Sequence, residues 1–293
     1  MTGGSSGIVG IGAQRLTLRN CTAHATASIG IFFLESSSGS VDNCTASDNP
    51  RFGINVQQGS GVTITNSTIS GNGAAGILVF ATGGARIGVT NAGQAAGNQI
   101  TGNRGSGILV NNGGGAYIGG NTITGNGTGG PAAIGAAGIF VSEASADIAG
   151  ANTISGNGGF GIEVLNAKVI LGDLAGAFGS TNTITGNGRG GVQGVEGAGI
   201  DFRNAVINNN LGVGFQLVLR SVASGSNSSI NNNGGDGIDL IQGSAISLGA
   251  PFTVTGNANE GLRCFDASSN FAGNTSGITG NAQGDVDAAC TGF

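Results

Sequence analysis

Several residue types are scarce in this chain of 293 residues. Tryptophan is absent, tyrosine and histidine occur once each, and only 9% of the residues are charged. No run of 18 apolar residues occurs, which argues against a membrane-spanning helix. The 10 basic and 15 acidic residues give a net charge of −5. This balance argues against nucleic acid as a partner, because surfaces that bind nucleic acid are basic.

Glycine, in contrast, is abundant, with 62 residues. Collagen would need glycine at every third position, and the sequence lacks that spacing. A disordered chain would have low hydrophobicity and high net charge, whereas 39% of these residues are apolar. The composition therefore favours a folded repeat protein, which can grow along one axis beyond the usual size of a single domain.

A glycine followed by a large apolar residue returns about every 23 residues. This pattern occurs at Gly7, Gly30, Gly53, Gly76, Gly107, Gly138, Gly161, Gly191, Gly214, Gly237 and Gly261. Gly284 continues the spacing but is followed by an aspartate. A second mark runs in phase with the first: an asparagine that ends a "TGN" or "SGN" triplet, as at Asn72, Asn126 and Asn157. Both marks indicate a repeated structural unit.

Each unit contains three short segments that alternate apolar and polar residues. In the unit that starts at Gly53 they are "GINV", "GVTIT" and "STIS", separated by turn-forming residues. One unit is too small to bury its own core, so it must stack on its neighbours. We therefore expect an all-β, single-stranded parallel β-helix of about 12 coils. The side chains expected to point inward in this coil are Ile54, Val56, Val62, Ile64 and Ile69.

The period lengthens at three places, and the extra residues predict loops within 81–99, 127–137 and 167–181. Residues 1–293 are otherwise expected to form one domain. The first residues, "MTGGSSGIVGIG", have no basic segment and already follow the repeat. We therefore expect a signal peptide and a capping segment to precede Met1 in a longer native protein.

Stretches such as "NTITGNG", "NTISGNGGFGIEV" and "STISGNGAAGILV" resemble the right-handed parallel β-helix repeats of the pectin-lyase-like superfamily. The resemblance covers essentially the whole chain and implies that fold. It implies much less about function, since the superfamily includes polysaccharide lyases, hydrolases, epimerases, adhesins and phage tail proteins. The "NTD", "GHG", "RIK" and "DPH" strings of its hydrolases and alginate epimerases are absent. The single histidine, His24, is more readily interpreted as a solvated turn residue than as a catalyst.

In the superfamily's enzymes the active site lies beside the first strand of each coil. In this chain the outward-facing position of that strand is expected two residues after the repeat glycine. In the C-terminal half this position holds Glu163, Gln193, Gln216, Asp239 and Arg263. Stacked at about 4.8 Å per coil, these side chains suit a hydroxyl-rich sugar chain. The first hypothesis is therefore an extracellular protein that binds polysaccharide or another surface. A solvated polar face without a ligand is the alternative.

The second hypothesis is a Ca²⁺-dependent polysaccharide lyase with a divergent site. The resemblance implies an arginine base and carboxylates that hold Ca²⁺, an ion that prefers oxygen ligands. In this chain Arg263 would be the base, with Asp239 and Asp266 as Ca²⁺ ligands.

The same outward positions are apolar in the N-terminal half. They predict an exposed strip that consists of Phe32, Leu34, Leu78, Phe80, Leu109 and Phe140. Monomers rarely leave such a strip in contact with water. The third hypothesis is therefore a scaffold that forms homo-oligomers through this strip. An upstream segment or an inserted loop could cover it instead.

Two further residue types bear on structure. A set of asparagines thirteen residues after the glycine is expected at turns, stacked into side-chain ladders: Asn20, Asn43, Asn66, Asn204, Asn227 and Asn274. We expect a disulfide between Cys264 and Cys290, which would suit a secreted protein. Cys21 and Cys44 are 23 residues apart in adjacent coils, and here a stacked pair of thiols is as plausible as a bridge.

Overall fold

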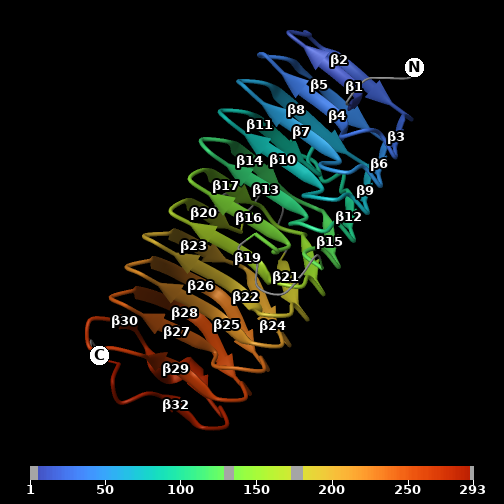
Figure 1. Ribbon diagram of the computed structural model, residues 1–293. Coiled ribbons are helices and arrows are strands. Elements are labelled where there is room, and N and C mark those ends of the chain that lie inside the picture. Colours follow the sequence, from blue (N-terminus) through green and yellow to red (C-terminus); the bar gives the residue numbers. More distant parts are fainter. Residues whose placement is uncertain (1–5, 129–134, 173–180, 291–293) are drawn as a thin grey trace.

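The computed structural model describes residues 6–128, 135–172 and 181–290, and they wind into an elongated stack of short parallel strands (Figure 1). Apart from a one-turn 3-10 helix, η1 (Thr275–Gly277), every regular element in these ranges is a strand. No helix among them is long and apolar enough to cross a membrane. The predicted parallel β-helix of about 12 coils is confirmed.

The first strand of each coil lies in sheet A, which has 12 strands within the described residues. Neighbouring strands are parallel and in register, so that Ile54 pairs with Ile77 and Ile77 with Ile108. In spatial order the strands are β1 (Ser6–Ile11), β4 (Ile29–Leu34), β7 (Ile54–Gln57), β10 (Ile77–Phe80), β13 (Ile108–Asn111), β16 (Ile139–Ser142), β19 (Phe160–Leu165), β22 (Gly190–Val195), β25 (Val213–Val218), β27 (Ile238–Ile241), β29 (Glu260–Cys264) and β32 (Gly284–Val286).

Sheet B contains the second and third strands of the coils, 20 in the part that the structure describes. The second strands are β2 (Leu16–Arg19), β5 (Ser38–Asp42), β8 (Gly61–Thr65), β11 (Gly84–Ile87), β14 (Gly115–Ile118), β17 (Ser145–Ile148), β20 (Lys168–Leu171), β23 (Gly199–Arg203) and β30 (Asn270–Gly273). The third strands are β3 (Thr22–His24), β6 (Thr45–Ser47), β9 (Thr68–Ser70), β12 (Gln99–Thr101), β15 (Thr122–Thr124), β18 (Thr153–Ser155), β21 (Asn182–Thr185), β24 (Ala205–Asn208) and β31 (Ile278–Thr279). Two long strands, β26 (Val222–Asn231) and β28 (Ala245–Thr255), span both positions and join the two rows into one sheet.

The core is the inside of the stack. All five side chains predicted to point inward in the coil of Gly53 are buried: Ile54, Val56, Val62, Ile64 and Ile69. Side chains at equivalent positions stack on one another from coil to coil and form one continuous apolar cluster. Each coil therefore shares its core with the coils above and below it, as the size of the repeat requires.

A ladder of asparagines runs along this core, at the position where most coils end a "TGN" or "SGN" triplet. It comprises Asn49, Asn72, Asn103, Asn126, Asn157, Asn187, Asn210, Asn233, Asn257 and Asn281. Each Nδ2 donates to the Oδ1 of the next asparagine at 2.8 to 3.0 Å. A shorter ladder of the same kind joins Asn98, Asn121, Asn152 and Asn182. These amides form hydrogen bonds with one another and with the backbone around them.

The repeat glycines make room for the long ladder. A Cβ on Gly53 would lie 2.8 Å from Nδ2 of Asn72, 2.6 Å from Cγ2 of Ile69 and 2.7 Å from the carbonyl oxygen of Gly76. The equivalent glycines, such as Gly138 and Gly161, meet the same three neighbours. The glycine mark and the asparagine mark are thus two parts of one contact inside the stack.

The asparagines predicted at turns behave differently. Five of the six have a positive φ, from 47° to 52°, and are turn residues. Asn274 is the exception, because it has φ −93° and caps η1. Only short side-chain links form here, from Asn43 to Asn20 and from Asn227 to Asn204, while Asn66 donates to Asp42. The side-chain ladder that the sequence predicts exists, but its continuous form lies at the triplet asparagines.

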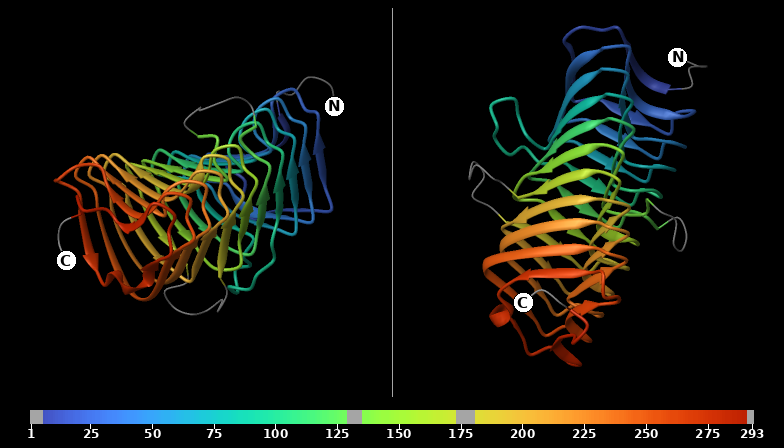
Figure 2. Two further views of the ribbon diagram at one scale, coloured as in Figure 1. Left: turned by 90° about the horizontal axis from the view of Figure 1, so that it is seen from below. Right: turned by 90° about the vertical axis from the view of Figure 1, so that its left-hand side faces the viewer.

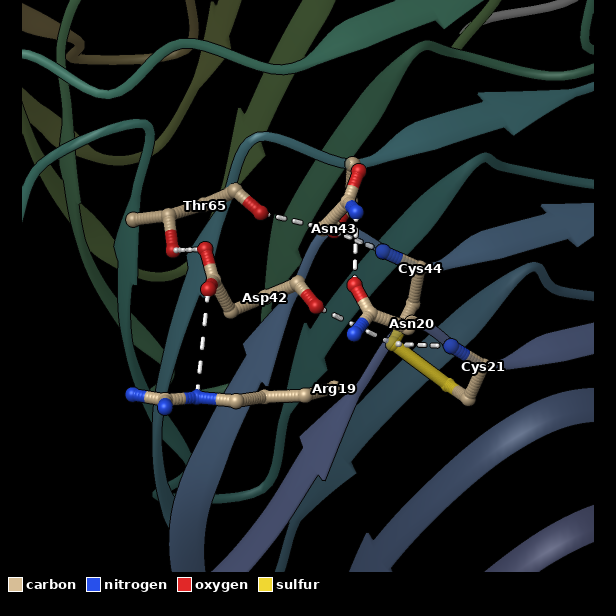
Figure 3. The surroundings of a disulfide bond; sticks show 8 residues. Arg19, Asn20, Cys21, Asp42, Asn43, Cys44 and Thr65 are labelled. Atoms are coloured by element: carbon tan, nitrogen blue, oxygen red, sulfur yellow. Dashed lines mark hydrogen bonds and ion pairs between the residues drawn. A yellow bond between two sulfur atoms is a disulfide. The ribbon is translucent and has the colours of Figure 1, made fainter.

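Both cysteine pairs form disulfides. The Cys264–Cys290 bridge ties the last described coil to strand β29. Cys21 and Cys44 are also bridged, which resolves the alternatives that the spacing left open. Figure 3 shows this bridge beside the stacked pair Asn20 and Asn43.

The first and third insertions each follow a regular second strand. β11 and β20 occupy residues 84–87 and 168–171 as ordinary strands, so the extra residues of the first loop lie at 88–98 and those of the third begin at Gly172. A strand can pair there because only the segment after it departs from the repeat. The first of these loops stands out from the stack in teal in the right-hand view of Figure 2. Most of the other two loops lies outside the described residues.

Replacing Asn157 with alanine should destabilise the fold strongly. Asn157 donates to Asn187 and to the carbonyl of Ile123, and its Oδ1 accepts from Asn126, so the change leaves several buried groups without partners. Each such group costs about 1–3 kcal/mol, so we expect a loss of at least about 3 kcal/mol in the free energy of unfolding. Chemical denaturation measures it. Thr153→Ala on the exposed face of β18 is the control, and equal stability of the two variants would contradict this role of the ladder.

Candidate functional site

The five side chains predicted to bind a ligand lie in one row on the outer face of sheet A. They come from successive strands and are paired in register in the order Glu163, Gln193, Gln216, Asp239, Arg263. The row is less open than the sequence suggested. Glu163 and Asp239 are only 5% exposed, and the other three are half-buried.

The middle of this row is joined by side-chain hydrogen bonds. Nε2 of Gln193 donates to Oε1 of Gln216 at 2.7 Å, and Nε2 of Gln216 donates to Oδ2 of Asp239 at 3.2 Å. The other oxygen of Asp239, Oδ1, is buried and has no hydrogen-bond partner within the described part of the chain. Glu163 instead accepts from the backbone N–H of Gly135, at 3.4 Å. These bonds link the two amides in a row that ends at the carboxyl group of Asp239.

Two carboxylates that the sequence analysis missed complete the cluster: Asp236 and Glu260. Nη1 of Arg263 lies 3.6 Å from Asp236 and its Nε lies 3.8 Å from Glu260. Both acids stand immediately before a repeat glycine. The repeat glycine and the residue after it both face the core, so the residue before the glycine faces outward. Strict alternation of inward and outward residues does not predict two consecutive inward positions. Their position immediately before the repeat glycine is the sequence feature that could have identified Asp236 and Glu260.

Arg263 is held in place on three sides. Besides its two acidic partners, its guanidinium lies 4.2 Å from the centre of the Phe265 ring. Such stacking adds a cation–π attraction to the ion pairs. The arrangement suits a side chain that donates hydrogen bonds from a fixed position.

Burial and mutual repulsion change the acidity of the cluster. Burial, together with the nearby charge of Asp236, raises the pKa of Asp239 to about 7. Burial also raises the pKa values of Glu163 and Glu260. Asp239 and Asp236 interact through their side chains, and two carboxyl groups can hydrogen-bond only when one of them carries a proton. A proton on Asp239, which its raised pKa favours, permits that hydrogen bond.

The carboxylates predicted to bind Ca²⁺ have different surroundings. Asp239 belongs to the row described above. Asp266 lies on a turn, where it accepts from the backbone N–H groups of Gln242 and Gly243 and from Ser268. The hydrogen bond from Ser268 is the main reason that its pKa falls to about 2. No group of three potential metal ligands occurs among residues 6–128, 135–172 and 181–290. A Ca²⁺ site on Asp239 and Asp266 stays a prediction.

The apolar strip is largely covered, contrary to expectation. Leu78 and Phe140 are each 7% exposed, and Phe32, Phe80 and Leu109 are half-buried. Leu78, Leu109 and Phe140 stack directly on one another, so each covers its neighbours. The second insertion also approaches Phe140, because a Cβ on Gly135 would lie 3.1 Å from that ring. Oligomerisation through this strip stays a prediction.

His24 lies on the third strand of its coil, away from this row. Its Nδ1 is 3.1 Å from the hydroxyl of Ser47 and 3.3 Å from a carboxylate oxygen of Asp48. The side chain is exposed. The exposed side chain agrees with a solvated residue, but His24 ends strand β3 and does not lie in a turn.

The chain belongs to the family described as right handed beta helix region, whose pattern it matches over residues 1–146 and 132–276. Among solved structures it is similar to the periplasmic alginate epimerase AlgG, at 13% identity and a TM-score of 0.55 over 87% of this chain. It spans 61% of that enzyme's length. A weaker likeness, with a TM-score of 0.42, is to the A-module of the mannuronan C-5 epimerase AlgE4 of Azotobacter vinelandii, at 13% identity over 94% of this chain and 74% of that module. No curated protein matches the sequence. At 13% identity, the likeness to AlgG shows the right-handed β-helix fold alone.

Replacing Asp239 with asparagine should alter how stability depends on pH. The raised pKa means that the folded protein holds this proton more tightly than the unfolded chain, so the wild type loses stability between about pH 4 and pH 7. Asparagine cannot lose a proton, so the variant should melt at a higher temperature than the wild type at pH 8. The difference should shrink toward pH 4.

Thermal denaturation followed by circular dichroism from pH 4 to pH 8 measures this effect. Asp147→Asn, on the exposed face of β17, is the matched control and should leave the pH profile unchanged. A constant difference between Asp239→Asn and wild type at every pH would contradict the assignment.

Proposed function

We propose that this chain binds a hydroxyl-rich polysaccharide along the outer face of sheet A, between β19 and β29. The observation that carries the proposal is the hydrogen-bonded row from Gln193 through Gln216 to Asp239, with Arg263 on the next strand. Amide and carboxyl groups in a fixed row can each donate to or accept from sugar hydroxyls. The row advances by about 4.8 Å per coil, so a chain molecule can meet several coils in turn.

The charge of this face favours a neutral sugar chain. Glu163, Asp236, Asp239 and Glu260 all lie on it, with Arg263 between two of the acids. An anionic polymer would be repelled by this group of carboxyls.

We place the protein outside the cytoplasm in this proposal. Two disulfides support it, because such bonds persist in oxidising compartments. The similar epimerase AlgG is described as periplasmic, which agrees with that setting.

A Ca²⁺-dependent lyase is the alternative, with Arg263 as the base. It is distinguished by its product: elimination leaves an unsaturated sugar that absorbs ultraviolet light. Incubation with anionic polysaccharides and Ca²⁺, followed by absorbance, tests it. No product on pectate, alginate or glycosaminoglycan would remove this alternative.

Loss of the two glutamines should abolish sugar binding. The double variant Gln193→Ala/Gln216→Ala removes the linked amides while leaving the core of the coils untouched, because both side chains are half-buried on the outer face. We expect at least a roughly tenfold loss of affinity, since two hydrogen-bonding groups are removed. Binding is measured on an array of neutral and acidic glycans. The control is Gln99→Ala, an exposed amide on β12, and binding that survives in the double variant would contradict the proposed face.

A further inference from the structure

A concave surface lies on sheet B, in the N-terminal coils. It is a groove of about 610 Å³ formed over β2, β5, β8 and β11, the second strands of four successive coils. Its volume falls within the range of known ligand sites. It belongs to a different sheet and different coils from the row on sheet A, so its chemistry has to be considered separately.

The groove is hollow because glycine replaces side chains at its floor. Gly61 and Gly84 are paired in register with Ser38 on one side and Gly115 on the other, on the outer face of the sheet. A Cβ on Gly61 would meet no atom within 4 Å, so open space lies above it. Val222 occupies the equivalent position in a later coil, which shows that the fold accepts a large side chain there.

The first insertion adds a polar wall. Asn91, from the loop at 88–98, accepts a hydrogen bond of 2.9 Å from the hydroxyl of Thr63. The loop is itself fixed by a hydrogen bond from the backbone N–H of Thr90 to the carbonyl of Gln94, by one from the N–H of Gln94 to the Thr90 hydroxyl, and by a bridge between Val89 and Ala95. The inserted loop at 88–98 therefore forms one side of the groove.

The charge of the groove is opposite to that of the whole protein. Its lining includes Arg15 and Arg86 but no aspartate or glutamate, although acidic residues outnumber basic ones in the chain by 15 to 10. Neither guanidinium forms an ion pair with any residue that the structure describes. The two arginines stand three coils apart, roughly 14 Å along the stack by the spacing of strands.

Two contacts fix the orientation of the Arg86 side chain. Its Nε donates to the carbonyl oxygen of Thr90 at 3.3 Å, and its guanidinium lies 4.9 Å from the centre of the Tyr117 ring. These contacts orient the side chain and leave Nη1 and Nη2 for an anion. A fixed guanidinium binds carboxylate or sulfate oxygens well, since two parallel hydrogen bonds can form.

The nearest acid on the same strands is already occupied. Asp42, two residues after Ser40, accepts hydrogen bonds of 2.9 Å from Thr65 and Asn66, and one of its oxygens lies 4.0 Å from Arg19 (Figure 3). The hydrogen bonds from Asn66 and Thr65 lower its pKa, so it is ionised at neutral pH and paired. Its charge is therefore compensated outside the groove.

We propose that this groove binds an anionic saccharide chain. The hydroxyls of Thr17, Ser40 and Thr63 lie in one row between the two arginines and would meet sugar hydroxyls. Arg15 and Arg86 would hold carboxylate or sulfate groups at two points of the chain. Nucleic acid fits less well, because its dense phosphates require many more basic residues than two. This proposal does not rest on the face of sheet A.

The test is the affinity of the whole chain for three probes: a carboxylated oligosaccharide (oligogalacturonate), a sulfated one (a heparin oligosaccharide) and a neutral one (a dextran oligosaccharide). Isothermal titration calorimetry at low and at moderate salt measures binding. We expect at least one anionic probe to bind, the neutral probe not to compete with it, and affinity to fall with salt. Which anionic probe binds distinguishes carboxylate from sulfate recognition.

Two variants locate the site. Arg86→Gln should lower the affinity roughly tenfold or more, as expected for the loss of a charged hydrogen-bond donor. Gly61→Val should fill the floor and lower the affinity similarly, whereas Gly115→Val, at the equivalent open position of the next coil but one, should leave it unchanged. Arg51→Gln, an exposed arginine beside Phe52, controls for the change in net charge.

Several results would overturn the proposal. One is the absence of binding by both anionic probes. Another is equal binding in Gly61→Val and wild type, which would place the anion outside the groove even if Arg86→Gln weakened it. The double variant Gln193→Ala/Gln216→Ala should retain anionic binding, so that failure of this proposal and failure of the sheet A proposal are separately visible.

Discussion

The structure depends on hydrogen bonding between buried asparagine side chains. A polar amide in an apolar core destabilises a protein unless its donors and acceptors are paired. Here each amide in the long ladder bonds the amide of the next coil and the backbone around it. This requirement fixes the distance between coils and their register at one corner of the stack, because a coil shifted by one residue would leave several buried groups unpaired.

The repeat glycine follows from the same constraint. Its missing Cβ is the space into which the asparagine amide and a core isoleucine fit, at distances below 3 Å. With the interior fixed in this way, the outward positions are free to vary from coil to coil. That freedom explains how one repeated frame can carry a row of amides and carboxyls on sheet A and a groove with two arginines on sheet B.

The two surfaces differ in the sign of their charge, and local structure explains how. On sheet A the residue before the repeat glycine is turned outward, which adds Asp236 and Glu260 to the row and buries Asp239 beside them. On sheet B, Gly61 and Gly84 lie at the bottom of the groove, and Arg15 and Arg86 lie at its two ends. The insertion at 88–98 places Asn91 beside Thr63 at the edge of this groove. A break in the repeat therefore helps to shape the groove.

The sequence by itself determined the coil length, the three strands of a coil and the inward residues of the coil of Gly53. It also determined the stacking of Glu163, Gln193, Gln216, Asp239 and Arg263, since a strict period places equal positions above one another. Only the tertiary structure decided which asparagines form the continuous ladder, that Cys21 and Cys44 are bridged, and how deeply Asp239 and Phe140 are buried. It also decided that Asp236 and Glu260 meet Arg263, and that a groove lies over Gly61 and Gly84. The physical reason is that period specifies which residues are neighbours, whereas burial, charge and free space depend on how turns and insertions direct the side chains around them.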